Sequence, residues 1–130
     1  MAKFPGNTCP CGNNPPYATC CGQYLDGGLI APTAEALMRS RYTAYTLRRE
    51  DYLLTTWHPA TRPAASGLAD EPPTQWTGLE VKRHVLQDAT HAIVEFVACY
   101  KINGRAHRLH EISRFVQANG HWLYIDGEPS

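Results

Sequence analysis

Four of the five cysteines lie in one thirteen-residue stretch near the amino terminus. The pattern is Cys9-Pro10-Cys11, an eight-residue spacer and then Cys20-Cys21. Four thiolates that converge on one centre are a ligand set that Zn²⁺ prefers in a closed tetrahedral site. The segment has few apolar side chains of its own, so it cannot hold its shape by core packing. We therefore expect Cys9, Cys11, Cys20 and Cys21 to bind one structural zinc ion.

Disulfide bonds or free thiols are the main alternative to zinc. A bridge between neighbouring members of either cysteine pair would be strained or vicinal. A secretory signal would place the chain in an oxidising compartment, where disulfides form. The first residues lack the apolar core of such a signal. An iron–sulfur centre is a further alternative, because thiolate ligation by itself does not exclude it. A zinc ion with four thiolates has no open coordination position, so the predicted site serves structure or binding, not catalysis.

Size and composition exclude several classes of protein. The chain has 130 residues, which is one domain with a small appendage, and its 43% hydrophobic and 18% charged residues are typical of a globular protein. Twelve basic and twelve acidic residues balance to a net charge of zero, which disfavours nucleic acid as a partner, including RNA contact through the cysteine loop. No apolar run is long enough to cross a bilayer. We expect a soluble cytoplasmic protein with no membrane partner.

The spacing of the cysteines resembles the SEC-C motif, the zinc-binding tail of the preprotein translocase ATPase and of several unrelated proteins. Gly-Asn precedes the pattern, and a glycine follows each cysteine pair, as in that motif. The translocase spacer carries lysines and its last ligand is usually histidine, whereas here the spacer has no lysine and the last ligand would be Cys21. The resemblance thus implies metal binding without the basic character that docks the translocase tail on its chaperone.

A change of composition after Gly27-Gly28 indicates a linker and divides the chain into two expected units, residues 1–28 and 29–130. Apolar residues then recur with helical spacing from Pro32 to about Arg48, and proline suits the first turn of a helix. Arg41 falls on the apolar face of this helix. A shorter helix is predicted from Asp51 to Trp57, followed by a proline-rich loop.

The carboxy-terminal half alternates between apolar and polar residues and predicts a four-stranded antiparallel meander. Asn103-Gly104 and Asn119-Gly120 separate alternating runs, which is a strong signal for two-residue hairpins. Such turns set the register, which predicts Phe96 opposite Glu111, Phe115 opposite Tyr124 and Ser113 opposite Asp126. The strands are expected from Trp76 onward and over residues 91–101, 105–117 and 121–126.

Five short segments resemble the YchJ family, whose body has a nuclear transport factor two-like (NTF2-like) fold, a cone of curved sheet closed by helices. The segments are Leu37 to Tyr45, Trp76-Thr77-Gly78-Leu79, Val94 to Ala98, His110-Glu111-x-Ser113-Arg114-Phe115 and Trp122-x-Tyr124-x-Asp126-Gly127. The resemblance implies an α+β fold, with a SEC-C-like zinc knuckle in residues 1–28 and a cone in residues 29–130. In this cone, helices pack on a curved four-stranded antiparallel sheet. The resemblance implies no particular reaction.

The inner face of the cone collects aromatic side chains and two carboxylates, which is the composition of many small-ligand pockets. The pocket candidates are Arg41, Tyr42, Tyr45, Phe96, Glu111, Ser113, Phe115, Trp122, Tyr124 and Asp126. Glu111 and Asp126 could form an acid–base pair, with Arg41 holding an anion. The interpretation we favour is a buried ion-pair network in which Arg41 neutralises both carboxylates.

Two functions follow. In the first, the protein is a zinc-binding adaptor that docks a cytoplasmic protein through the knuckle, with Pro15, Pro16 and Tyr17 as the contact tip and the cone as scaffold or small-ligand receptor. In the second, the cone binds a small molecule and hydrolyses or isomerises it, with Glu111 or Asp126 as the base. We favour the adaptor, because no arrangement of nucleophile and base stands out in the sequence.

Overall fold

Four antiparallel strands and a layer of short helices make up the computed structural model, which describes residues 9–12, 16–65 and 74–129. The sheet has the order β1-β2-β3-β4, as a meander requires. Its strands are β1 (Gln75–Leu86), β2 (His91–Ile102), β3 (Arg105–Ala118) and β4 (His121–Pro129). The helical elements are the 3₁₀ turn η2 (Tyr17–Thr19), α1 (Gly22–Leu25), α2 (Ala34–Thr46) and α3 (Glu50–Thr55). The predicted α+β architecture is confirmed.

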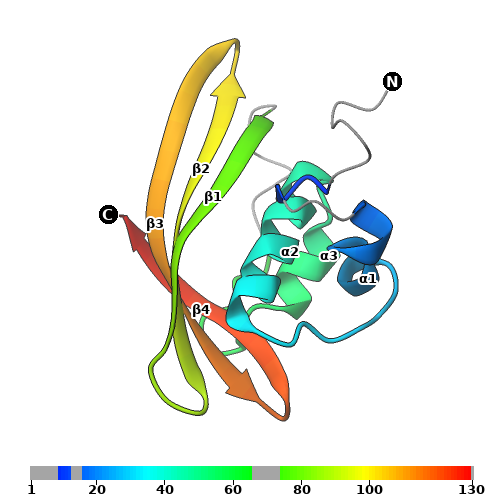
Figure 1. Cartoon of the computed structure of the whole chain (residues 1–130), viewed down its shortest axis with the longest axis vertical. Coiled ribbons are helices and arrows are strands. Elements are labelled where there is room, and N and C mark those ends of the chain that lie inside the picture. The colour runs from blue at the N-terminus through cyan, green and yellow to red at the C-terminus, as the bar shows by residue number, and fades with distance from the viewer. Residues whose placement is uncertain (1–8, 13–15, 66–73, 130) are drawn as a thin grey trace.

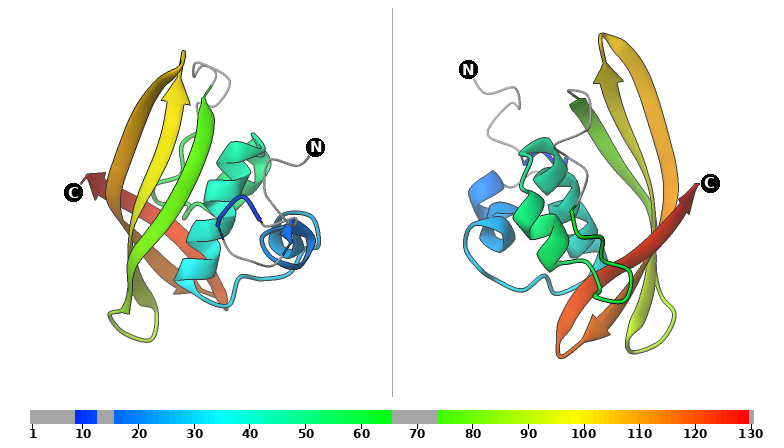
Figure 2. Two further views of the ribbon diagram at one scale, coloured as in Figure 1. Left: turned by 45° about the horizontal axis from the view of Figure 1, so that its top comes forward. Right: turned by 180° about the vertical axis from the view of Figure 1, so that it is seen from behind.

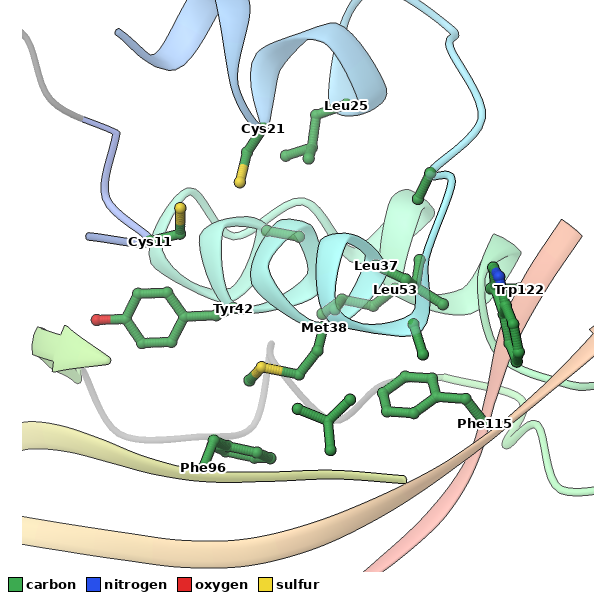
Figure 3. Packing of buried hydrophobic residues seen from close by; sticks show 14 of the residues in the cluster. Cys11, Cys21, Leu25, Leu37, Met38, Tyr42, Leu53, Phe96, Phe115 and Trp122 are labelled. Carbon is green, nitrogen blue, oxygen red and sulfur yellow. The ribbon is translucent and has the colours of Figure 1, made fainter. Parts of the chain in front are cut away.

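The sheet is long and curved, and the helices lie against its concave face (Figure 1). The views in Figure 2 show α2 between the sheet and α1. Between α2 and the sheet lies the core, where Leu37 and Phe115 are almost completely buried (Figure 3). Leu53 on α3 and Val94 on β2 are completely buried in the same cluster. The helix layer therefore closes one face of the sheet, as in the predicted cone.

Local chemistry accounts for the boundaries of α2. The hydroxyl oxygen of Thr33 accepts a hydrogen bond from the main-chain N–H of Ala36 at 3.0 Å, which caps the first turn. Glu35 adds a negative charge at that end, where the helix dipole favours it. The chain leaves the helix at Arg48, whose φ of 57° lies in the left-handed region. The predicted helix is therefore confirmed, with ends that differ by two residues from those expected.

Both Asn-Gly pairs form the expected tight hairpins. Asn103 and Gly104 have φ values of 52° and 79°, and Asn119 and Gly120 have 53° and 80°. Positive φ at both central residues defines the turn whose twist matches that of the strands. The register between β2 and β3 follows, and it places Phe96 opposite Glu111 as predicted.

The register between β3 and β4 contains a shift that the sequence does not reveal. Phe115 pairs with Tyr124 as expected, but Arg114 pairs with Asp126 and Ser113 with Gly127. Ile125 is therefore an extra residue in β4, and such a bulge moves the residues beyond it to the opposite face. The predicted pairing of Ser113 with Asp126 is wrong for this reason.

The segment after α3 lies along the free edge of β4 beside this bulge. The N–H of His58 donates to the carbonyl oxygen of Tyr124, and the N–H of Tyr124 donates to that of Thr56, each at 2.8 Å. The hydroxyl of Thr61 donates to the carbonyl oxygen of Ile125 at 2.7 Å. These bonds satisfy main-chain groups that a regular edge strand would expose, and they attach α3 to the sheet.

Candidate metal centre and inner cavity

The four amino-terminal cysteines meet in space as the spacing predicts. Their sulfur atoms all lie within 4.8 Å of one another, and the Sγ atoms of Cys11 and Cys20 are 3.7 Å apart. A zinc–sulfur bond of about 2.3 Å implies a sulfur–sulfur edge of about 3.8 Å in a regular tetrahedron. All the cysteines are free thiols, so no disulfide competes for these sulfurs. The four side chains thus fit a tetrahedral metal ion.

Two tight turns bring the cysteine pairs together. The N–H of Gly12 donates to the carbonyl oxygen of Cys9 at 3.0 Å, and Gly12 has a φ of 95°, a left-handed conformation that favours glycine. The second pair stands at the start of α1, where the N–H of Leu25 donates to the carbonyl oxygen of Cys21. The Cys11 and Cys21 side chains point toward one another from these two turns (Figure 3).

The cysteine cluster is buried against α2. Cys9, Cys11 and Cys21 are no more than 1% exposed, and they belong to the same core cluster as Leu37 and Tyr42. The sulfur of Cys9 lies 3.9 Å from the hydroxyl oxygen of Thr43. Although residues 1–28 are expected to form a separate unit, the described part of that segment shares its core with the helix layer.

The thiols interact strongly with one another. Hydrogen bonds with Cys11 and then Cys21 lower the pKa of the Cys9 thiol to about 2, against the effect of burial. Hydrogen bonds with Cys11 and Cys9, together with burial, raise the pKa of Cys21. The buried cluster therefore favours a shared negative charge, and a divalent cation is the ligand that stabilises several thiolates at once.

A cavity of about 260 Å³ lies between α2 and the inner face of the sheet. Its wall contains the predicted residues Arg41, Tyr42, Tyr45, Phe96, Glu111, Ser113, Phe115 and Tyr124. Trp122 is buried but lies outside this wall, in the core. The wall also contains Met38, Trp76, Ala98 and Leu109, which were not among the candidates. The inner face thus encloses a small, mainly aromatic space.

Arg41 is 5% exposed, yet it does not neutralise the carboxylates as expected. Its Nη1 atom donates to the carbonyl oxygen of Leu53 at 2.8 Å and to the hydroxyl oxygen of Thr56 at 2.7 Å. Its guanidinium lies 4.5 Å from the centre of the Tyr124 ring and 5.2 Å from that of Trp57. Within the described ranges no carboxylate comes within 4.0 Å of it. Burial lowers the pKa of Arg41, as it does for a cation that leaves water.

The two predicted carboxylates lie on opposite faces of the sheet. Glu111 faces the cavity, where its Oε2 accepts a hydrogen bond from the hydroxyl of Ser113 at 3.0 Å. Asp126 lies on the outer face and forms an ion pair with Arg114 at 2.6 Å. The bulge in β4 causes this separation, so the predicted acid–base pair of Glu111 and Asp126 is wrong, and so is the network with Arg41.

Two tryptophans complete the inner layer. Trp76 makes an edge contact with Tyr42, with ring centres 5.7 Å apart, and a tilted contact with Tyr100 at 5.1 Å. A register shift between Trp76 and Gly78 interrupts the alternation of β1, which hides the position of Trp76 from pattern analysis. Trp57 packs edge-on against Tyr124 at 5.0 Å and was predicted only as the end of a helix. The place of Trp76 in the YchJ-like segment Trp76-Thr77-Gly78-Leu79 is a sequence signal that could have included it.

The fold and the cysteine cluster define a class of protein: a SEC-C-like motif packed on an NTF2-like domain. Residues 33–127 match the family described as YchJ_M-like, the middle NTF2-like domain of YchJ. The chain therefore belongs to the YchJ family. It is 53% identical to a UPF0225 protein of Ralstonia nicotianae, over 98% of this chain and 94% of that one. A UPF0225 protein of Cupriavidus metallidurans is 56% identical over 92% of this chain and 87% of its own length.

Two solved structures have the same fold. The solution structure of a SEC-C motif containing protein from Rhodopseudomonas palustris has a TM-score of 0.80 at 30% identity, and the match covers 95% of this chain and 98% of that one. The crystal structure of a SEC-C motif containing protein from Psychrobacter arcticus has a TM-score of 0.79 at 34% identity, covering 95% and 82%. Among the described residues, no helix has the length and apolar character needed to cross a membrane.

Proposed function

We propose that Cys9, Cys11, Cys20 and Cys21 bind one zinc ion and that the protein is a non-catalytic adaptor that docks a cytoplasmic partner protein beside this site. The proposal rests on the cluster of four sulfurs within 4.8 Å of one another, at a site that is buried against α2. Zinc with four thiolates is closed to substrate, so its contribution is to hold the chain in shape. We call the metal centre and its two turns, residues 9–12 and 16–25, the cysteine knuckle.

Zinc is the metal that suits this donor set. Four thiolates are soft ligands, which disfavours magnesium, calcium and manganese. The sulfur–sulfur distances suit a single ion, and Arg39 donates to the carbonyl oxygen of Cys11 at 2.9 Å. An outer hydrogen bond of this kind orients the ligands of metal sites. The bound ion would thereby fix the amino-terminal turns on α2.

The exposed apolar residues that follow the knuckle support the docking role. Leu29 and Ile30, four and five residues after the end of α1, are 59% and 53% exposed. Exposure of their apolar side chains to water is unfavourable, and burial of this apolar surface under a partner stabilises the complex. Of the predicted contact tip, Pro16 is exposed, and Pro15 lies outside the described residues. Tyr17 is half-buried and donates its hydroxyl hydrogen to Asp26 at 2.7 Å, so we propose Leu29 and Ile30 as the main contact.

Metal analysis tests the zinc assignment. The full chain purified without chelator should contain one zinc ion per molecule. Cys11→Ser should lose the metal, because Cys11 is completely buried in the cluster. Cys99→Ser is the matched control and should retain the metal, because Cys99 lies on β2 outside the cluster. Metal-free wild type with disulfide-bonded cysteines would contradict the assignment.

Affinity recovery from cytoplasmic extract, with each bait immobilised, tests the docking role. A variant with Leu29→Ser and Ile30→Ser should lose the recovered protein and keep its zinc. Leu86→Ser is the matched control, because Leu86 is 61% exposed at the end of β1 and is not part of the knuckle. Equal recovery by both variants would exclude this surface as the docking site.

A second function, that of a small-molecule receptor, is favoured by the cavity. A space lined by aromatic side chains, with a few polar groups among them, is the usual form of a ligand pocket. The volume of about 260 Å³ lies below the range of roughly 300–1,000 Å³ that drug-sized ligands occupy, so the ligand would be small. Catalysis has less support, because the two carboxylates do not share the cavity.

A further inference from the structure

The cavity contains a buried cation without an ion-pair partner. Arg41 projects from α2 into the space, and no carboxylate in the described part of the chain lies within 4.0 Å of its guanidinium. Only its Nη1 atom donates hydrogen bonds within the described ranges, to Leu53 and Thr56. A guanidinium carries five N–H donors and stays protonated in proteins, so further donors are available to a ligand. Charged groups this deeply buried are normally paired.

The surroundings of Arg41 hold the cation in place. Leu53 and Thr56 fix one end of the guanidinium, while the Tyr124 and Trp57 rings lie against it. Cation–π contacts stabilise a desolvated arginine, but they do not neutralise its charge as a counter-ion does. A planar guanidinium presents a fork that matches a carboxylate in geometry as well as in charge. The side chain is therefore already positioned to receive an anionic group.

A second polar group faces the same cavity. One oxygen of Glu111, Oε2, accepts a hydrogen bond from Ser113, and Oε1 accepts none from any residue that the structure describes. An ionised carboxylate only accepts hydrogen bonds, so Glu111 repels a bare anion and attracts a hydroxyl or amino group. Arg41 and Glu111 together favour a molecule that offers both an anion and a nearby donor.

We propose that the cavity binds a small organic acid with an apolar body and a hydroxyl or amino group close to its carboxylate. The carboxylate contacts Arg41, the hydroxyl or amino group donates to Glu111, and the body packs on the aromatic wall formed by Tyr42, Trp76 and Phe96. This inference rests on the second function above, the small-molecule receptor, and names its ligand class. It does not depend on the docking role of the knuckle.

Three matched probes test the inference on the zinc-loaded full chain, by calorimetry and by chemical-shift mapping of the main-chain amides. The probes are 3-phenyllactate, 3-phenylpropionate, which lacks the hydroxyl, and 3-phenyllactamide, which lacks the charge. Phenyllactate should bind most tightly and shift the amides of Phe96 and Ser113. Loss of the hydroxyl and loss of the charge should each weaken binding about tenfold or more, because hydrogen bonds to charged groups are strong.

Variants separate the two contacts. Arg41→Gln should abolish the preference for the two acids over the neutral amide. Because this substitution also removes the hydrogen bonds of Arg41 with Leu53 and Thr56, the fold of the variant is checked separately. Glu111→Gln keeps an acceptor for Ser113 and should reduce the preference for phenyllactate over phenylpropionate. Asp126→Asn is the matched control and should change nothing, because Asp126 lies on the outer face with Arg114.

The outcomes distinguish the inference from the function on which it rests. If the neutral amide binds in the cavity as tightly as phenyllactate, the protein is a receptor but the ligand class is wrong. If neither acid nor amide shifts any cavity residue, both the ligand class and the receptor function are overturned. A preference for phenyllactate that survives in Glu111→Gln would overturn the role of Glu111.

Discussion

Arg39, on α2, donates a hydrogen bond from Nη1 to the main-chain carbonyl oxygen of Cys11 at 2.9 Å. The same side chain forms an ion pair through Nε with Glu35, one turn earlier on the helix, at 3.0 Å. Arg39 thus joins the first cysteine turn to the helix that also carries Arg41, and α2 contributes both to the surroundings of the cysteine cluster and to the cavity.

Replacement of Arg39 by glutamine should weaken metal retention. The variant keeps all four cysteines but loses the charged hydrogen bond that orients the Cys11 turn, and loss of outer partners at metal sites typically costs about tenfold or more in affinity. Competition with a chromogenic chelator measures the affinity. Arg108→Gln is the control, because Arg108 is exposed on β3 and its substitution removes the same charge. Equal zinc affinity in the two variants would contradict the role of Arg39.

Gly127 on β4 is predicted to be necessary for the position of Glu111. A Cβ at this position would collide with the Glu111 carboxylate and would lie 3.1 Å from the Ser113 hydroxyl oxygen. Gly127→Ala should therefore displace Glu111, break its hydrogen bond with Ser113 and lower the free energy of unfolding by about 1 kcal/mol. Urea denaturation measures the loss.

Two further variants check the cause of that loss. Gly78→Ala on β1 should be close to neutral, because no described residue other than its chain neighbours has an atom within 4 Å of the added methyl group. In a Glu111→Ala background, Gly127→Ala should lower the free energy of unfolding much less than it does in the wild type, because the carboxylate with which the added methyl group collides is gone. Additive losses in the double variant would show that Glu111 is not the source of the strain.

The link between α1 and α3 is predicted to depend on pH. A hydrogen bond from Arg49 and then one from Tyr17 lower the pKa of Asp26 below its ordinary value of 3.8. Because the pKa is lowered in the folded state, the stabilisation is fully present above about pH 5 and is lost as the pH falls through the lowered value. Arg49→Gln should raise the pKa of Asp26, as measured by NMR titration of the side-chain carboxyl. An unchanged pKa would exclude Arg49 as the cause.

Local signals in the sequence were sufficient for much of the fold. Asn and Gly readily adopt the positive φ that a two-residue hairpin turn requires at both central residues. The Asn-Gly pairs therefore set the hairpins, and with them the pairing of Phe96 with Glu111, without any tertiary information. The cysteine spacing likewise predicts the cluster of four sulfurs, because only eight residues of chain separate the two pairs and a glycine follows each pair. Alternation in β2 and β3 placed Phe96, Ser113 and Phe115 on the buried face.

The identity of the charged partners was decided by tertiary structure. Strict alternation places Asp126 inside the cone, but the extra residue Ile125, whose carbonyl oxygen is bonded by Thr61, moves it to Arg114 on the outer face. Arg41 turned out to bind Leu53 and Thr56, because α3 folds back beside α2. A bulge and a helix–helix contact depend on groups far apart in the chain, so no periodicity records them. The sequence by itself therefore determined the hairpins and the cysteine cluster, whereas only the packing of α3 beside α2 decided that Arg41 donates to Leu53 and Thr56 and not to a carboxylate.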